Sequence, residues 1–168
     1  MLGSANKGEN GYQNQVAGDQ TKVEVYIKPF YIYPRGGWNV VFRHKDPEKR
    51  EIIAKTMEAI CKNDHIGYDY NGRNTLMKLA RACNYDIASI KEYCETDCSA
   101  ATTVCCMAAG IPESQALIDG WNCMTTYVMR NMLRKTGMFI ELTESKYLTS
   151  DKYLYRGDIL LNELKSFN

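Results

Sequence analysis

The sequence predicts one domain that mixes helices and strands, and its class is therefore α+β. Three observations support this: an alternating apolar and polar stretch near the N-terminus, an amphipathic stretch with a helix cap in the first half, and a capped run of small residues near position 100. A chain of 168 residues has the usual length of one domain and can bury a hydrophobic core. We expect residues 1–20 to form a flexible arm and residues 21–168 to form the domain.

The first half of the domain is predicted to contain two strands followed by two helices. Residues 21–33 alternate apolar and charged side chains, the period of two that is typical of a half-buried strand. A turn rich in proline and glycine follows, and residues 38–44 return as a second strand, so we expect a hairpin. Asp46 is placed to cap a helix over residues 47–64, and a shorter helix is expected over residues 75–83.

The second half is predicted to contain two further helices and two strands. Asp97 precedes residues 98–109, whose small side chains end before a glycine, so they should form a capped helix packed closely among its neighbours. Another helix is expected over residues 125–137. Residues 138–142 and 158–161 are rich in apolar residues and are predicted to be strands.

The charge and hydropathy of the chain exclude several classes of function. With 21 basic and 20 acidic side chains the net charge is +1, so no nucleic-acid or other polyanionic partner is indicated. No apolar run approaches the roughly 20 residues of a membrane helix, and the N-terminus lacks the apolar core of a signal peptide. We therefore expect a protein made in the cytoplasm without a signal peptide and with no membrane partner.

The seven cysteines are odd in number and irregularly spaced, which favours reduced thiols. Cys94 and Cys98 form a C-x3-C pair that could hold a metal or a disulfide. A zinc site needs two further ligands at matched spacing, and neither the later cysteines nor the two histidines, His44 and His65, supply them. We therefore predict no metal.

Cys98 has a local sequence suited to nucleophilic chemistry. It follows the expected cap Asp97, and a helix N-terminus lowers the pKa of a thiol because unpaired N–H groups favour the thiolate. The backbone N–H of Cys98 would also point toward an oxyanion forming beside the sulfur. The alternative is that Cys98 only packs in the interior, as buried cysteines often do.

Three motifs around Cys98 occur in an order that resembles a known family. The run TDCSA resembles the D-C-S-[GA] motif of the NlpC-type papain-like cell-wall peptidases. The upstream run IGYDYNG is similar to their Y-x-x-G segment, and the downstream run YRGDIL is similar to their P-G-D-[LI] strand entry. More widely, residues 18–161 resemble endolysins of phages and prophages of Gram-positive bacteria.

The resemblance implies a papain-like core in which the helix carrying Cys98 packs on an antiparallel sheet that carries the base. It also implies hydrolysis of a peptidoglycan amide, in the stem peptide or at the muramoyl–alanine link, through a thioester and without a cofactor. Cys98 would be the nucleophile, and Tyr68 would hydrogen-bond substrate or help to form the oxyanion site. Asp97 would cap the helix, and Ser99 would contact substrate.

The sequence departs from this family in one respect. The family places its catalytic histidine on the strand after the G-D-[LI] strand, but no histidine follows Cys98, and the chain ends ten residues after Asp158. We therefore expect a truncated form with an incomplete sheet. His65 is a substitute base if the topology is permuted, although a histidine at the end of a helix is the simpler interpretation. His44 is expected to end a strand.

Two further questions stay open at this level. The aromatic run YIKPFYIYPRGGW, which includes Tyr26 and Tyr31, could stack on sugar rings, although aromatic side chains more often serve packing. The leading function is a peptidoglycan hydrolase, and the alternative is a non-catalytic wall-binding or interaction module descended from one. A redox or acyl-carrier thiol protein would leave two of the three motifs unexplained.

Overall fold

The structure, a computed structural model, describes residues 1–7 and 24–163 and confirms the mixed α+β class. The helices are α1 (Pro47–Lys62), α2 (Thr75–Ala82), α3 (Cys98–Ala108), α4 (Glu113–Ala116), α5 (Thr126–Thr136) and α6 (Ser145–Leu148). The strands are β1 (Leu2–Ala5), β2 (Val25–Lys28), β3 (Val40–His44), β4 (Ile66–Tyr68), β5 (Cys94–Thr96), β6 (Leu117–Ile118), β7 (Asn122–Cys123), β8 (Phe139–Leu142) and β9 (Ile159–Leu161). A 3₁₀ turn, Ile87–Ser89, precedes β5.

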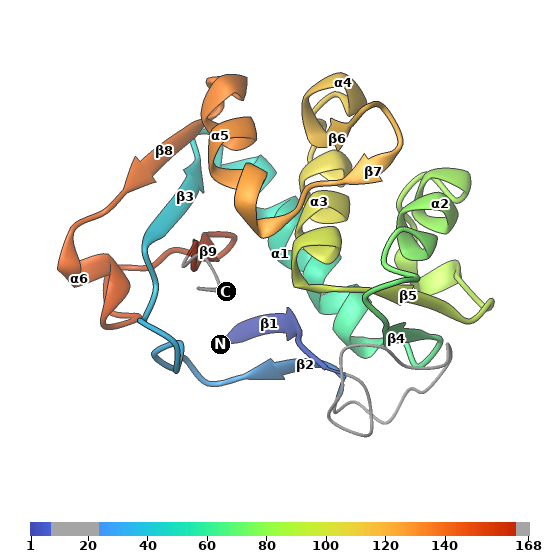
Figure 1. Ribbon diagram of the computed structural model, residues 1–168, viewed down its shortest axis with the longest axis horizontal. Coiled ribbons are helices and arrows are strands. Elements are labelled where there is room, and N and C mark those ends of the chain that lie inside the picture. The colour runs from blue at the N-terminus through green and yellow to red at the C-terminus, as the bar shows by residue number, and fades with distance from the viewer. Residues whose placement is uncertain (8–23, 164–168) are drawn as a thin grey trace.

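The strands form small separate sheets. Strands β8, β3 and β9 make an antiparallel sheet with β3 in the centre, β1 pairs antiparallel with β2, β6 with β7, and β4 lies parallel to β5. Figure 1 shows the three-stranded sheet on one side of the molecule, α2 with β4 and β5 on the other, and α3 between them. No helix among the described residues is long and apolar enough to cross a membrane.

The expected hairpin between the first two predicted strands is wrong. β2 pairs with β1, and both edges of β3 are occupied, since Val41 lies opposite Leu142 of β8 and Leu160 of β9. Buried β3 thus forms both of its ladders with strands from the C-terminal third of the chain. Turn chemistry between two neighbouring strands could not reveal these distant partners.

The N-terminal arm also differs from the expectation where the structure describes it. Leu2–Ala5 forms strand β1, and Ala5 is fully buried. Gly3 lies so close to α1 that a Cβ atom on it would come within 2.5 Å of the Met57 side chain, so the strand fits here because this residue is glycine. The remainder of the expected arm, residues 8–20, lies outside the described residues.

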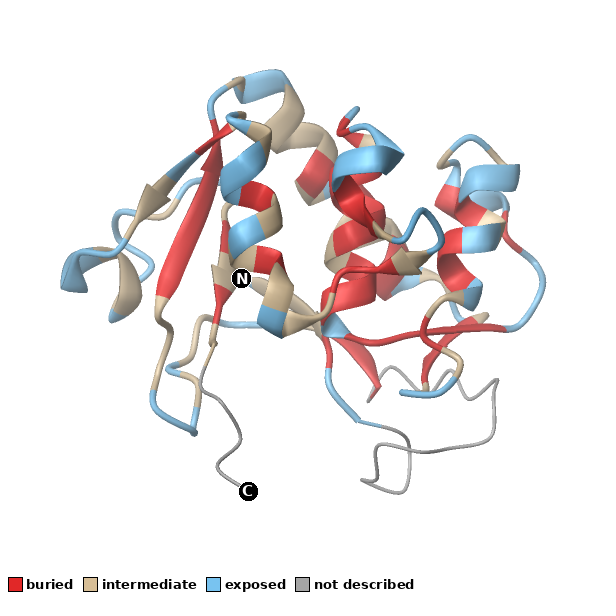
Figure 2. Cartoon of the chain, turned by 45° about the horizontal axis from the view of Figure 1, so that its top comes forward, coloured by how far each residue is buried: buried red, intermediate tan, exposed pale blue. Residues whose placement is uncertain are grey.

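The two long helices in the first two thirds of the chain form as their caps predict. The Asp46 side chain accepts a hydrogen bond from the Glu48 backbone N–H and begins α1, whose residues Ile53 and Ile60 are buried. Asp97 accepts from the Ala100 N–H and begins α3. Most side chains of α3 are buried, as Figure 2 shows, because their small size lets α1, α2, β1 and β7 pack closely around it.

The C-terminal third also follows its local signals. Helix α5 ends at Gly137, whose φ of 68° suits glycine, and the predicted strands form as β8 and β9. His44 ends β3 as expected, and its Nδ1 accepts a hydrogen bond from the Asp46 N–H. Asp158 begins the approach to β9, where its carboxylate accepts from the Tyr155 N–H and forms an ion pair with Arg43.

Candidate functional site

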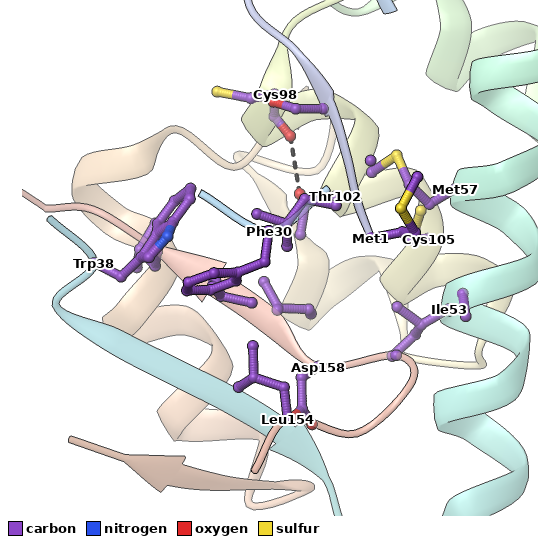
Figure 3. Close-up of a pocket in the computed structure, with 18 of the residues that line it drawn as sticks. Met1, Phe30, Trp38, Ile53, Met57, Cys98, Thr102, Cys105, Leu154 and Asp158 are labelled. Carbon is purple, nitrogen blue, oxygen red and sulfur yellow. Dashed lines mark hydrogen bonds between the residues drawn. The ribbon is translucent and has the colours of Figure 1, made fainter. Parts of the chain in front are cut away.

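Cys98 lines a pocket that lies between the helices and the three-stranded sheet. All seven cysteines are free, and Cys98 is the exposed one. The pocket has a volume of about 550 Å³, within the range of small-molecule sites, and is lined by parts of β1, α1, α3 and β9 together with half-buried aromatic residues. Figure 3 shows Cys98 at one end of the pocket and Leu154 with Asp158 at the other.

Two parallel strands bring Tyr68 to the start of α3. Tyr68 lies opposite Thr96 in the β4–β5 pair, and the Asp69 N–H donates to the Thr96 carbonyl. Because parallel strands end at the same edge, Tyr68 lies within electrostatic range of Cys98 although 30 positions separate them in the sequence. Tyr68 does not itself line the pocket. The Tyr68 N–H donates to the Glu24 carboxylate at 2.8 Å. Glu24 was expected on the polar face of its strand, but it is buried and supports this edge.

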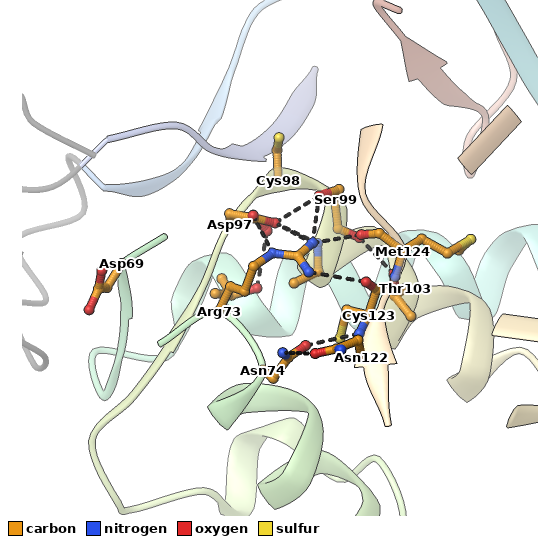
Figure 4. Close-up of polar contacts among 12 residues, drawn as sticks. Asp69, Arg73, Asn74, Asp97, Cys98, Ser99, Thr103, Asn122, Cys123 and Met124 are labelled. Atoms are coloured by element: carbon orange, nitrogen blue, oxygen red, sulfur yellow. Dashed lines mark hydrogen bonds and ion pairs between the residues drawn. The ribbon is translucent and has the colours of Figure 1, made fainter. Parts of the chain in front are cut away.

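A buried arginine, Arg73, holds the turn that carries Cys98. Its guanidinium donates to both oxygens of Asp97 at 2.5 and 3.2 Å and to the Ser99 hydroxyl at 2.8 Å. It also donates to the carbonyls of Cys123 and Met124 at 3.0 and 2.6 Å. In Figure 4 Arg73 lies between these two groups of acceptors, whereas Asp69 points away. Sequence reasoning missed Arg73, because its partners come from two distant segments.

Asp97 and Ser99 flank Cys98 at the start of α3. Asp97 is the helix cap, and it also accepts a hydrogen bond of 2.9 Å from the Ser99 hydroxyl. Ser99 is buried and its hydroxyl is engaged by Asp97 and Arg73, while the residue also forms part of the pocket wall. Both side chains therefore hold the turn in place through their contacts with Arg73, and the Cys98 side chain projects away from them.

The expectation that the Cys98 thiol has a lowered pKa is wrong. Surrounding protein raises the pKa of Cys98 to about 11 by desolvation, and the neighbouring charge of Asp97 adds to the rise. The backbone N–H groups of Ser99 and Cys98 and the charge of Arg73 lower this pKa, as a helix N-terminus should, but they are outweighed. The side chain has exposed surface, yet densely packed atoms around the sulfur disfavour its anion. At neutral pH the resting site holds a thiol.

Two tyrosines lie within electrostatic range of Cys98. Burial is the main cause of a raised pKa at Tyr68 and at Tyr31, and a negative charge on Cys98 raises the pKa of both further. Both phenols therefore stay protonated at neutral pH and are able to donate a hydrogen bond. Tyr68 was predicted as a site residue, whereas the nearness of Tyr31 to the thiol was not.

The predicted aromatic face divides into core and rim. Tyr26 is buried in the core, whereas Tyr31 and Tyr33 are half-buried and line the pocket together with Trp38, with ring centroids 5.7 and 5.4 Å from that of Trp38. The Trp38 indole N–H donates to the Tyr31 carbonyl. These contacts show that the rings pack on one another.

The two histidines lie elsewhere. His65 follows the end of α1, where its Nδ1 is 3.1 Å from the Asn63 side-chain oxygen and its ring lies against Tyr93. His44 is buried against Phe139. Neither histidine lines the pocket that Cys98 opens onto. Within residues 1–7 and 24–163, no cluster of three or more histidine, cysteine or acidic side chains is arranged to hold a metal ion.

The fold and this site define a mixed α+β protein with an exposed cysteine at the start of a buried helix, facing a pocket. The family model of the endolysin-like domain matches residues 2–166, and the chain belongs to this family. Membership confirms the resemblance to endolysins and relates the chain to phage lysins of peptidoglycan. No curated protein and no solved structure matches the chain.

Proposed function

We propose that the protein is a peptidoglycan hydrolase that cleaves an amide bond, in the stem peptide or at the muramoyl–alanine link, with Cys98 as nucleophile. The observation that carries the proposal is the exposed Cys98 at the N-terminus of α3, on a pocket of about 550 Å³, in a chain of the endolysin-like family. We propose that the protein is made in the cytoplasm and acts on the wall after release, with peptidoglycan as its partner and without a cofactor.

The chemistry follows from the atoms around the sulfur. The Cys98 thiolate attacks the amide carbonyl carbon, and the carbonyl oxygen becomes an oxyanion near the N–H groups that begin α3. The protonated hydroxyl of Tyr68 is a further donor for that oxyanion or for substrate. The carbon–nitrogen bond then breaks, the amine leaves with a proton, and water hydrolyses the Cys98 thioester to a carboxylate and the free thiol.

The proton acceptor is the incomplete part of this mechanism. The raised pKa of Cys98 means that a base must remove its proton before attack, and the described pocket wall contains no histidine. In the NlpC-type enzymes that the motifs resemble, the histidine lies on the strand after the one that corresponds to β9. His65 is the remaining candidate in this chain, and its contacts with Asn63 and Tyr93 would have to be exchanged for one with the thiol.

A wall-clearing assay with matched cysteine variants tests the proposal. We expect the protein to clear a gel containing Gram-positive cell walls and Cys98→Ala to lose clearing. Cys83→Ala, which changes a half-buried cysteine outside the pocket lining, should retain it. Labelling of newly formed amino termini identifies the bond cleaved. Equal clearing by the wild type and Cys98→Ala would show that Cys98 is not the nucleophile.

A second candidate function is a non-catalytic wall-binding or interaction module. The raised pKa of the thiol and the lack of a histidine on the described pocket wall favour it. If it holds, the wild type and Cys98→Ala will co-sediment equally with purified walls, and neither will release new amino termini. Release of amino termini by the wild type alone would reject this alternative.

A further inference from the structure

We propose that Arg73 is a positioning residue for the Cys98 turn: it fixes the Asp97 carboxylate and the Ser99 hydroxyl, neutralises Asp97, and ties the turn to β7. The inference rests on the proposed role of Cys98 as the reacting group. Arg73 does not touch the pocket itself, so its effect on the reaction is exerted through its neighbours.

Arg73 is held in one position by hydrogen bonds to two other segments of the chain. The residue is 9 % exposed, and its donors reach five acceptors on two other segments, the start of α3 and the β7 region. A planar guanidinium can satisfy this many acceptors in fixed directions, whereas the compact ammonium of lysine cannot. The residue therefore determines where the first turn of α3 lies relative to β7.

The charge of Arg73 matters because Asp97 is buried next to Cys98. Asp97 is 6 % exposed and already accepts from the Ala100 N–H and the Ser99 hydroxyl. A carboxylate at this place opposes a thiolate on Cys98, and Arg73 offsets that effect. Without the arginine, Asp97 would keep a buried negative charge beside the sulfur, and the thiolate would form less readily.

A second set of contacts makes the link to β7 rigid. Next to Arg73, the Asn74 side chain accepts from the Cys123 N–H at 2.9 Å and donates to Asn122 at 2.8 Å. Thr103 of α3 accepts from the Met124 N–H at 3.1 Å. The segment before α2, the start of α3 and β7 are thus joined by hydrogen bonds at several points, and Arg73 is the member that reaches the residues flanking Cys98.

Alkylation of Cys98 by iodoacetamide, followed by mass spectrometry of its peptide from about pH 6 to about pH 11, tests the inference in the intact protein. We expect Arg73→Met to slow alkylation near pH 8 by about tenfold, the change that one unit of thiol pKa produces. Arg73→Lys restores the charge and should recover part of the rate. The double variant Arg73→Met with Asp97→Asn removes both charges and should recover most of it.

Arg43→Met is the matched control, because Arg43 is another buried arginine with a bidentate aspartate partner. It should lower stability without moving the pH profile of Cys98 alkylation. Circular dichroism establishes which variants are folded, and if Arg73→Met is not, Arg73→Lys and the double variant decide. An unchanged pH profile in the folded Arg73 variants would overturn the inference. Because alkylation needs no peptidoglycan, a shifted profile with no wall clearing by the wild type would reject the proposed function alone.

Discussion

Two buried ion pairs of the same chemical type lie in different halves of the molecule. Arg73 and Asp97 meet at 2.5 Å at the start of α3, and Arg43 and Asp158 meet at 2.6 Å at the start of β9. All four side chains are at most 10 % exposed. In both pairs the arginine binds both carboxylate oxygens and a backbone carbonyl, so each pair fixes the chain where an element begins.

The surroundings of the two pairs differ. The remaining contacts of Arg73 are hydrogen bonds to Ser99 and Met124, whereas the Arg43 guanidinium lies 3.6 Å from the ring centroid of Tyr155. Only Asp97 adjoins a reactive group, since Cys98 follows it directly. A buried arginine–aspartate pair thus stabilises the fold in both places, and the neighbouring residue decides whether the pair also influences chemistry.

Removal of either carboxylate should give the largest loss of stability, because it leaves a buried arginine without its charge partner. We expect Asp97→Ala and Asp158→Ala each to lower the free energy of unfolding by about 3–5 kcal/mol. Urea unfolding followed by circular dichroism measures it. Replacing Arg43 and Asp158 together by Met and Leu should recover most of the loss. A cost below about 1 kcal/mol for Asp158→Ala would show that its pair is not a structural equivalent of the Asp97 pair.

The turn before Asp158 should be more sensitive to backbone change than the turn before Cys98. Gly157 has φ of 87°, and a Cβ atom there would lie 2.1 Å from the Arg50 carbonyl oxygen, whereas Asp97 has an ordinary extended backbone. Gly157→Ala should therefore cost about 2–4 kcal/mol, from left-handed strain and a backbone clash together.

Gly120→Ala is the control for Gly157→Ala. Its φ is 78°, but nothing lies within 4 Å of the added carbon, so only the strain of about 1–2 kcal/mol should remain. Thermal unfolding of both variants measures the difference. Equal losses would mean that the chain near Arg50 moves aside, and that the turn holding Asp158 is not rigid.

Sequence reasoning succeeded where structure is determined locally. Asp46 and Asp97 cap their helices through residues two or three positions away, and Gly137 ends α5 by its own conformation. It failed for β1, because Leu2 pairs with Lys28, and for the supposed hairpin, because the partners of β3 lie in the last third of the chain. Pairing over such distances leaves no local signal.

The site was predicted to a similar degree. Cys98, Asp97 and Ser99 are consecutive, so their arrangement followed from one helix start. The role of Arg73 could not be predicted, because it depends on two other segments that pack against this arginine in the folded chain. The raised pKa of Cys98 was equally hidden, since desolvation depends on every neighbour of the sulfur and not on the helix end alone.

The link between α3 and β7 should contribute less than the ion pairs. The Thr103 hydroxyl is fully buried, accepts from the Met124 N–H and donates to the Ser99 carbonyl. Thr103→Val keeps the shape but leaves the Met124 N–H unsatisfied, so we expect a loss of about 1–3 kcal/mol in the free energy of unfolding. The Thr102 hydroxyl donates to the Cys98 carbonyl of its own helix and, among the described residues, bonds no other segment, so Thr102→Val should change stability by less than about 0.5 kcal/mol. Urea unfolding measures the loss of stability in both variants. Equal losses would mean that the hydrogen bond between Thr103 and Met124 adds nothing to stability.

The partly exposed ion-pair network around Glu141 should give the smallest effect, in contrast to the buried pairs. Hydrogen bonds from Arg134 and then Arg130 lower the pKa of Glu141 to about 2. Because the folded pKa lies below the ordinary value of 4.5, this contribution to stability is present above about pH 4.5 and is lost as the pH falls toward 2.

Solvent screening limits this contribution, and Glu141→Gln should cost less than about 1 kcal/mol at neutral pH. Unfolding of the wild type and the variant at neutral pH and near pH 2 measures it. The difference should be much smaller at the lower pH, where Glu141 is becoming protonated in the folded state, and it should shrink in high salt. A difference that is independent of pH would mean that Glu141 stabilises the fold by packing and not by its charge. The contrast between the buried ion pairs and this partly exposed network would then not rest on charge.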